Sequence, residues 1–285
     1  MYVNDHVIRI CANSPESSVI WEPTVRIATW NVNSVRQRLS PLLALLREAA
    51  PDALCLQETK CEDHVFPRLE IEDAGYNVAV HGQKGFNGVA ILSKSPLQDV
   101  TLGLPGFDGE AQSRYIEAVI ADGAGGVMRV ASIYAPNGNP PDTQKYSYKL
   151  AFMEALTRHA EALLRLEEPT VLAGDYNVIP EPRDVYEASA WIGDALFLPQ
   201  TRAAYQRLLN LGYADALRAT SDEGGLYTFW DYQAGAWQKN KGLRIDHLLL
   251  SPPAADRLAR VEIVKAMRAG DKPSDHVAIY ADFAA

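Results

Sequence analysis

Short apolar runs and helix-spaced leucines alternate along the chain from residue 25 onwards. Residues 25–31 and 53–58 are apolar runs of the kind that forms buried strands. Between them, leucines recur at helical spacing from Leu42, which predicts a helix with Ser40 as its N-cap and Pro41 in its first turn. A strand, a helix and a second strand in this order begin an α/β sheet.

The remainder of the chain predicts more strands and two further helices. The strands are expected at residues 76–80, 88–93, 114–121, 127–134, 171–175, 245–250, 261–265 and 277–281. A glycine-rich turn at residues 122–126 predicts a hairpin, because glycine supplies the positive φ that tight turns need. Helical spacing predicts helices at residues 143–167 and 201–210. Hairpins and α/β crossovers in one continuous pattern predict a single domain over residues 25–285, with helices outside two packed sheets.

The first 24 residues depart from this pattern. They contain a loop-like cluster of Asn, Ser, Pro and Glu at residues 13–18 and show no clear period. A basic start followed by a long apolar run is absent, so a signal peptide is not predicted. We expect residues 1–24 to form a loosely ordered N-terminal extension.

Composition and charge narrow the class of protein. The chain has 285 residues and is 47% hydrophobic, which favours a globular protein over a disordered one. Its three cysteines, Cys11, Cys55 and Cys61, are too few for a disulfide framework, and we expect a reducing compartment, the cytoplasm. No apolar run approaches the ~18 residues of a transmembrane helix, so we expect no membrane partner. The net charge of −9 excludes a general electrostatic nucleic-acid binder, but a nuclease with metal-binding carboxylates and a local basic face remains possible.

Polar residues recur where the predicted strands end or begin. They are Asn31, Glu58, Tyr134, Asn137, Asp175, Asn177, Asp246, Asp275 and His276. Loops beyond the strand ends of α/β sheets collect ligand sites. Several carboxylates in one site repel each other, so the site would need a hard cation such as Mg²⁺, or Mn²⁺, which accepts the same oxygen ligands. Such a cation beside a water-activating carboxylate and an Asp-held histidine suits the hydrolysis of a phosphate ester.

Each of these residues also has a structural interpretation. A turn would account for Asp175 with Asn177, and a capped loop for Asp275 with His276. A surface loop position would account for Glu58, an ion pair with Arg244 for Asp246, and core packing for Tyr134. Spacing in one sequence does not prove that the side chains converge, so both interpretations stay open.

Nine segments of the chain resemble the exonuclease III family of abasic-site endonucleases. They are WNVNS at 30–34, LQETK at 56–60, HGQKG at 81–85, GVAILS at 88–93, YAPN at 134–137, GDYN at 174–177, YTFWDY at 227–232, GLRID at 242–246 and KPSDH at 272–276. They occur in the order found in that family and cover nearly all of residues 25–285. Any one segment would be weak evidence, whereas the whole ordered set is highly specific.

The resemblance implies a fold and a reaction. The fold would be a four-layer α/β sandwich of the DNase I-like type, with two packed mixed sheets flanked by helices. The reaction would be metal-dependent hydrolysis of DNA on the 5′ side of an abasic site. Such enzymes commonly also remove 3′ nucleotides and 3′ blocking groups. The implied partner is double-stranded DNA with abasic sites or damaged 3′ ends, and we expect a monomer.

The resemblance also implies roles for matching residues. The metal region would be formed by Asn31, Glu58, Asp175, Asn177, Asp275 and His276. The catalytic residues would be Tyr134, Asp175, Asn177, Asp246 and His276. In this scheme Asp246 orients His276, and Asp175 positions or deprotonates the water. Tyr134 and Asn137 would contact the phosphate.

Basic and aromatic residues near these motifs are candidates for DNA contact. The basic ones are Lys60, Lys84, Arg114, Lys145, Lys149, Lys239, Lys241 and Arg244, of which Lys60 and Lys84 lie on the loops richest in motifs. Phe229 and Trp230 are expected to line an apolar slot for a sugar without a base, although core packing is the favoured interpretation for Trp230. Trp237 is a candidate wedge at the DNA.

Two rival functions are also compatible with the sequence. A phosphatase or phosphodiesterase of the same fold, acting on a small phosphate ester or a lipid headgroup, would share Glu58, Asp175, Asn177 and His276. It would not need the aromatic segment at 227–232. A binding protein that has lost catalysis is disfavoured, because every catalytic position carries the residue type that the resemblance implies.

Overall fold

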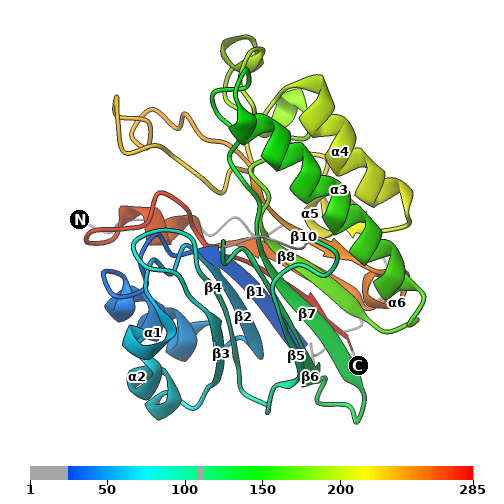
Figure 1. The fold of residues 1–285 in the computed structure, drawn as a ribbon. Coiled ribbons are helices and arrows are strands. Elements are labelled where there is room, and N and C mark those ends of the chain that lie inside the picture. The colour runs from blue at the N-terminus through cyan, green and yellow to red at the C-terminus, as the bar shows by residue number, and fades with distance from the viewer. Residues whose placement is uncertain (1–24, 108–111, 285) are drawn as a thin grey trace, which may run out of the picture.

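The computed structural model describes residues 25–107 and 112–284 (Figure 1). The extension expected at residues 1–24 lies outside the described residues. Cys55 and Cys61 are both buried free thiols, and Cys11 falls outside the described ranges. Within those ranges, no helix has the length and apolar character needed to cross a bilayer.

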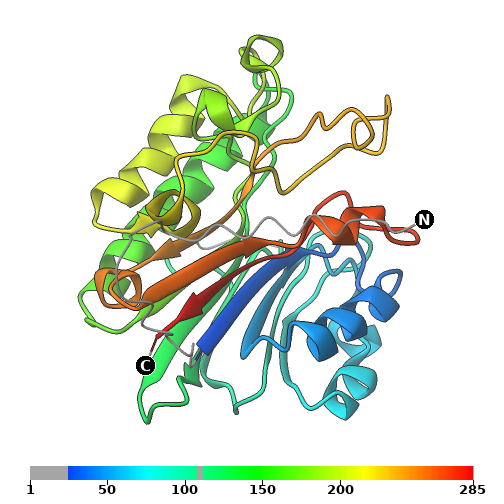
Figure 2. The same cartoon turned by 180° about the vertical axis from the view of Figure 1, so that it is seen from behind.

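Two six-stranded mixed sheets pack against each other (Figures 1 and 2). The first contains β1 (Val25–Asn31), β2 (Ala53–Gln57), β3 (Asn77–His81), β4 (Val89–Ser93), β11 (Leu258–Ile263) and β12 (Ile279–Phe283), in the order β11-β12-β1-β2-β4-β3. The second contains β5 (Gln98–Leu102), β6 (Tyr115–Ala121), β7 (Val127–Tyr134), β8 (Thr170–Asp175), β9 (Ala214–Asp215) and β10 (Asp246–Leu250), in the order β5-β6-β7-β8-β10-β9.

Helices cover the outer face of each sheet, which gives four layers in all (Figures 1 and 2). The helices α1 (Leu39–Glu48) and α2 (Arg68–Asp73) pack on the first sheet, and α3 (Gln144–Leu164) and α4 (Pro199–Asn210) pack on the second. The short elements are α5 (Ala216–Thr220), α6 (Pro252–Ala255) and the 3₁₀ turns Asp63–Val65, Pro182–Asp184, Ala188–Trp191 and Lys265–Ala269. The predicted four-layer α/β sandwich is therefore confirmed.

The strand β2 shows why the central strands read as continuous apolar runs. Cys55 faces the other sheet, whereas Leu54 and Leu56 pack in the cluster beneath α1. Successive side chains of a strand point to opposite faces, and here both faces are covered. All five residues of β2 are consequently buried.

The strand directions bring distant chain segments to one edge of the sandwich. The pairs β1–β2 and β7–β8 are parallel, so the carboxyl ends within each pair lie together. The strand β10 runs antiparallel to β8, and β12 runs antiparallel to β1. The amino ends of β10 and β12 therefore lie beside the carboxyl ends of β8 and β1. Asp246 is directly opposite Asp175 in this register. Residues that follow some strands and residues that begin others can thus meet.

The predicted elements are present, with ends that differ by up to three residues, and the hairpin at residues 122–126 is confirmed. The expected start of α1 is wrong. With Ser40 as N-cap the first helical residue would be Pro41, whereas the helix begins at Leu39 with Arg38 as its N-cap. The guanidinium of Arg38 donates to the carbonyl oxygens of Asn33 and Pro273, and this tertiary anchor holds the earlier start. The strand β5 escapes prediction because it is an edge strand with mostly exposed side chains.

Candidate active site

Two carboxylates from different sheets meet at Asn31, the last residue of β1. The Nδ2 atom of Asn31 donates hydrogen bonds to Glu58 Oε1 and to Asp175 Oδ2, each over 2.9 Å. Asn31 and Asp175 are buried, and Glu58 follows directly after β2 in a left-handed conformation with a φ of 52°. The structure thus brings together three residues that lie up to 144 positions apart in the chain.

A histidine–aspartate pair lies beside these carboxylates. His276 Nδ1 is 2.9 Å from Asp246 Oδ2, and His276 Nε2 is 3.8 Å from Asp175 Oδ2. The ring of Phe229 packs against the imidazole with a centroid distance of 4.9 Å. Because Asp246 holds Nδ1, the Nε2 atom is the one left to donate to a phosphate oxygen.

The charges of this site shift the pKa values of its groups. Burial would lower the pKa of His276, but the carboxylates of Asp246 and Asp175 outweigh burial and raise that pKa. Burial raises the pKa of Asp175; the nearby His276 opposes this and Asp246 reinforces it. Burial also acts to raise the pKa of Glu58, but Lys60 and the amide of Asn31 outweigh it, so that pKa is lowered. Of these carboxylates, Asp175 is therefore the better proton acceptor, and His276 favours its charged form.

Lys60 lies on Glu58 and reaches into the same network. Its Nζ atom is 2.7 Å from Glu58 Oε2 and donates to Asn33 Oδ1 over 2.5 Å. Asn33 Nδ2 in turn donates to Asp275 Oδ1 over 2.9 Å. Asn33 therefore connects Lys60 with Asp275, and through Lys60 it joins the network of Glu58, a role that its residue type alone does not reveal.

A second hydrogen-bond network holds Asn177 next to Asp175. The backbone N–H of Asn177 donates to Asp175 Oδ1 over 2.9 Å, and Asn137 Nδ2 donates to Asn177 Oδ1 over 3.1 Å. Beneath them, Lys149 Nζ donates to the carbonyl oxygens of Asn137, over 3.0 Å, and of Asn177. Lys149 has no exposed surface. The expectation that Lys149 contacts DNA is therefore wrong.

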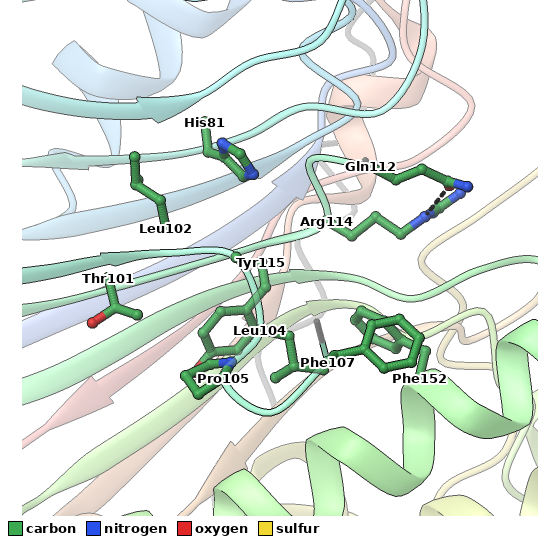
Figure 3. Close-up of a pocket in the computed structure, with 11 residues that line it drawn as sticks. His81, Thr101, Leu102, Leu104, Pro105, Phe107, Gln112, Arg114, Tyr115 and Phe152 are labelled. Carbon is green, nitrogen blue, oxygen red and sulfur yellow. Dashed lines mark hydrogen bonds between the residues drawn. The ribbon is translucent and has the colours of Figure 1, made fainter. Parts of the chain in front are cut away.

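Tyr134 ends β7 with its hydroxyl near Glu58 and Asp175. Burial raises the pKa of Tyr134 well above its ordinary value, and the two carboxylates add to this, so the hydroxyl keeps its proton and can donate. Arg114 stacks on the Tyr134 ring at 4.7 Å, and its Nε donates to Gln112 Oε1 over 2.7 Å. Figure 3 shows Arg114 and Gln112 pointing toward each other on the wall of a separate pocket.

A pocket of about 320 Å³ opens onto these groups. Its polar lining consists of Glu58, Tyr134, Asn137, Asn139, Asp175, Asn177, Asp194, Asp231, Asp275 and His276. Its apolar lining consists of Trp191, Leu196, Phe229, Leu243 and Ile245. Sequence analysis identifies Phe229 alone on the apolar side. The other apolar residues look like ordinary core positions in the sequence and reach the pocket through tertiary folding.

Comparison with known proteins identifies the family. A model of the endonuclease/exonuclease/phosphatase family matches residues 28–276. Exodeoxyribonuclease III of Haemophilus influenzae is 34% identical over 267 residues, which cover 91% of this chain and 100% of the relative. The chain belongs to the exonuclease III branch of this family. The family predicted from the nine segments is confirmed.

Three solved structures of DNA-acting enzymes superpose closely on the chain. The 3′–5′ exonuclease NExo from Neisseria meningitidis matches with a TM-score of 0.88 and 38% identity, over 92% of this chain and 100% of that one. An AP endonuclease from Archaeoglobus fulgidus matches with a TM-score of 0.86 and 38% identity, over 91% and 99%. A Neisseria 3′ phosphatase NExo bound to a product DNA hairpin matches with a TM-score of 0.86 and 37% identity, over 91% and 99%.

Several other candidate residues of this exonuclease III-type chain lie away from the pocket. Trp230 is fully buried in the core between the sheets, and Trp237 packs edge-on against it at 5.0 Å. The structure therefore places Trp230 in the core, and of the two aromatic residues predicted for the slot only Phe229 lines the pocket. Lys84, Lys145, Lys239 and Lys241 are exposed.

Arg244 is also buried and belongs to a structural ion-pair network. Its Nε is 2.6 Å from Asp184 Oδ1, and its Nη1 is 2.7 Å from Asp215 Oδ2. The suggested DNA contact of Arg244 is therefore wrong, and so is the suggested ion pair with Asp246. That carboxylate holds His276 instead.

The donor set of the site fits a hard divalent cation. Glu58 and Asp175 offer carboxylate oxygens at one point, Asn31 offers an amide, and Asp275 lies in the same pocket. The ligand atoms of Asp175, Asp246 and His276 also lie within 4.8 Å of one another. Oxygen ligands of this kind suit Mg²⁺ or Mn²⁺ rather than a thiolate-preferring metal.

Proposed function

We propose that this exonuclease III-type enzyme is a metal-dependent DNA repair nuclease. Its substrates would be the phosphodiester bond on the 5′ side of an abasic site and the phosphate bonds at damaged 3′ ends of duplex DNA. The observation that carries the proposal is the position of His276, held by Asp246 with Nε2 facing a pocket that also contains Asp175 and Glu58. The names of the similar proteins support the choice of DNA as the substrate.

The side chains of the pocket divide the work of one hydrolytic step. Asp175, fixed by the N–H of Asn177, accepts a proton from the attacking water. The water oxygen bonds to phosphorus while the bond from phosphorus to the 3′ oxygen breaks. The departing 3′ oxygen takes up a proton from solvent, which leaves a 3′-hydroxyl. His276 Nε2 and the Tyr134 hydroxyl donate hydrogen bonds to the phosphate oxygens, where negative charge increases.

Glu58 and Asn31 would hold the cation, with Asp175 and Asp275 close by. When bound, Mg²⁺, or Mn²⁺, neutralises phosphate charge and stabilises the charge that develops in the transition state. Lys60 covers one oxygen of Glu58 in this structure. We therefore expect Lys60 to move toward a DNA phosphate when a cation occupies the site.

The test uses duplexes of one sequence that differ at a single position. One contains a tetrahydrofuran abasic analogue, one ends in a 3′ phosphate and one is intact. We expect efficient cleavage of the first two with Mg²⁺, none with EDTA, and recovery when Mg²⁺ is restored. Efficient turnover of small phosphate esters, with both modified duplexes left uncut, would overturn the proposal and favour the small-ester phosphatase.

The same assay tests the residues. We expect Glu58→Gln and His276→Asn each to lower the rate by about 100-fold or more, the scale of lost acid–base and charge stabilisation. Glu72→Gln and His64→Asn are matched controls, because both positions are exposed and lie outside the pocket. Unchanged rates in both Glu58→Gln and His276→Asn would contradict the assignment of the site.

A further inference from the structure

Trp191 is an aromatic residue at the active-site pocket that the hydrolytic step does not use. It ends the 3₁₀ turn Ala188–Trp191, is only partly buried, and lines the same pocket as Asp175 and His276. Inside the pocket it continues the apolar wall formed by Leu196 and Phe229.

The segment that carries Trp191 is fixed to the phosphate-binding side of the pocket. Asn139 Nδ2 donates to both carboxylate oxygens of Asp194 over 3.2 Å, and Asn139 Oδ1 accepts from the N–H of Ala195 over 3.1 Å. The N–H of Asp194 donates to the carbonyl oxygen of Trp191 over 3.0 Å. These bonds anchor the backbone of the turn that carries Trp191 to the loop that carries Asn139.

Trp191 also differs from the other aromatic rings of the pocket. Phe229 packs on His276, and Tyr134 is stacked by Arg114. Within residues 25–107 and 112–284, neither an aromatic ring nor a cationic group stacks on the indole of Trp191. Trp191 packs against the apolar cluster that contains Leu196 and Ile245, but it stays partly exposed and lines the pocket, so part of this residue is accessible to a flat, apolar group of a ligand.

The proposed substrates differ in the group attached on the 3′ side of the attacked phosphate. A 3′-terminal nucleotide has a sugar with a base, an abasic site has a sugar without one, and a 3′ phosphate has neither. Every DNA base can stack on an aromatic side chain, so this interaction does not depend on the DNA sequence. A tryptophan in the pocket lining would therefore favour only the substrate that ends in a normal 3′ nucleotide.

We infer that Trp191 is a stacking platform for the base of a 3′-terminal nucleotide, and that it sets how strongly this enzyme removes normal 3′ nucleotides relative to its other reactions. The inference rests on the proposed nuclease function and adds a specificity determinant to the same site. It concerns recognition and leaves the hydrolytic residues unchanged.

The experiment compares Trp191→Ala, Trp191→Phe and the wild-type chain on three duplexes. They end in a normal 3′ nucleotide, end in a 3′ phosphate, or contain internal tetrahydrofuran. For Trp191→Ala we expect removal of the normal nucleotide to fall about 5- to 100-fold, the range of base–aromatic stacking, with the other two rates within about twofold. Trp191→Phe should recover most of the lost rate. Ile192→Ala is the matched control, since Ile192 is the next residue, is 68% exposed and does not line the pocket.

The outcomes separate this inference from the function on which it rests. A wild-type chain that cleaves none of the three duplexes refutes the nuclease itself. If the wild type cuts the modified duplexes but not the normal 3′ end, or if Trp191→Ala slows all three reactions equally, the platform is wrong. Faster removal of normal nucleotides by Trp191→Ala would also overturn it, because Trp191 would then be a barrier.

Discussion

Lys149 illustrates how one buried side chain can connect two loops of an active site. Its side-chain nitrogen donates to the backbone carbonyls of Asn137 and Asn177. The side chain of Asn137 bonds that of Asn177, and the N–H of Asn177 holds Asp175. Burial lowers the pKa of Lys149 to about 7, although Asp175 opposes this. The glycine at 138 makes room for it, because a Cβ there would lie 2.7 Å from Lys149 Cδ.

We predict that Lys149→Met lowers the turnover of an abasic-site duplex. The two buried carbonyls lose their donor, which costs about 1–3 kcal/mol, and the Asn177 loop becomes less well placed. We expect a reduction of about 10-fold or more in single-turnover rate, with DNA affinity little changed. Lys145→Met, on an exposed position of the same helix, is the control. A DNA affinity that falls more than the rate would show that Lys149 contacts DNA after all.

Residue types in the sequence identify the polar residues of the site but not the burial of the basic ones. Asn31, Glu58, Asp175, Asp246 and His276 come together as expected. Lysines and arginines on the motif segments all look like candidate phosphate contacts in the sequence. Whether one reaches solvent depends on acceptors from other segments, and such acceptors bury Lys149 and Arg244.

Among the elements, β10 begins beside an ion-pair network that lies next to Asp246, the aspartate that holds His276. Arg244 lies two residues before Asp246 and links the turn Pro182–Asp184 with β9. Asp215 also caps α5 by accepting from the N–H of Leu217. This network fixes the point at which β10 begins, and so the position of Asp246.

We predict that Asp215→Asn strongly destabilises the fold. Breaking a buried charge pair costs about 3–5 kcal/mol when the remaining charge has no other partner. Arg244 keeps Asp184 as a second partner, so we expect a loss near the lower end of this range. Urea unfolding at pH 7 should show a midpoint well below that of the wild type. Asp222→Asn, whose side chain is 94% exposed and pairs with Arg183, should change stability by less than about 0.5 kcal/mol.

The same pair predicts how stability depends on pH. Burial acts to raise the pKa of Asp215, but Arg244 outweighs it and lowers the pKa to about 2. The folded pKa thus lies below the unfolded value of about 3.9, so the contribution of Asp215 is complete above pH ~4 and is lost as pH falls toward 2. The wild type should lose stability across this window more steeply than Asp215→Asn. Equal slopes would contradict the role assigned to the pair.

The molecule as a whole carries a net charge of −9 and is proposed to bind a polyanion. Binding would then depend on a few local cations, among which Lys84 is exposed on the loop between β3 and β4. Salt weakens such contacts because binding releases counterions from DNA.

We predict that affinity for an abasic-site duplex falls at least about 10-fold between roughly 50 and 200 mM salt. Lys84→Ala should reduce the slope of log affinity against log salt by about one, as expected for one lost phosphate contact. Lys94→Ala is the control, because Lys94 follows the other end of β4 and pairs with Asp52. Fluorescence anisotropy at low protein concentration, in a buffer with Ca²⁺ in place of Mg²⁺ to limit cleavage, gives both quantities. A slope that Lys84→Ala leaves unchanged would exclude this loop from the DNA surface.

The order of strands and helices, the family, and the set of polar residues at strand ends can all be read from the printed sequence. These features depend on short-range periodicity and on segments that keep their order, as in residues 25–31 and 174–177. The pocket wall cannot be read in this way. Trp191, Leu196 and Ile245 reach one cavity only because the loops after β8, before α4 and before β10 fold against one another. Arg244 and Lys149 lose solvent only because acceptors arrive from remote segments. The local sequence pattern indicates which helix or strand each segment can form. The burial of a side chain, and the meeting of several side chains in one site, depend on contacts between segments far apart in the chain.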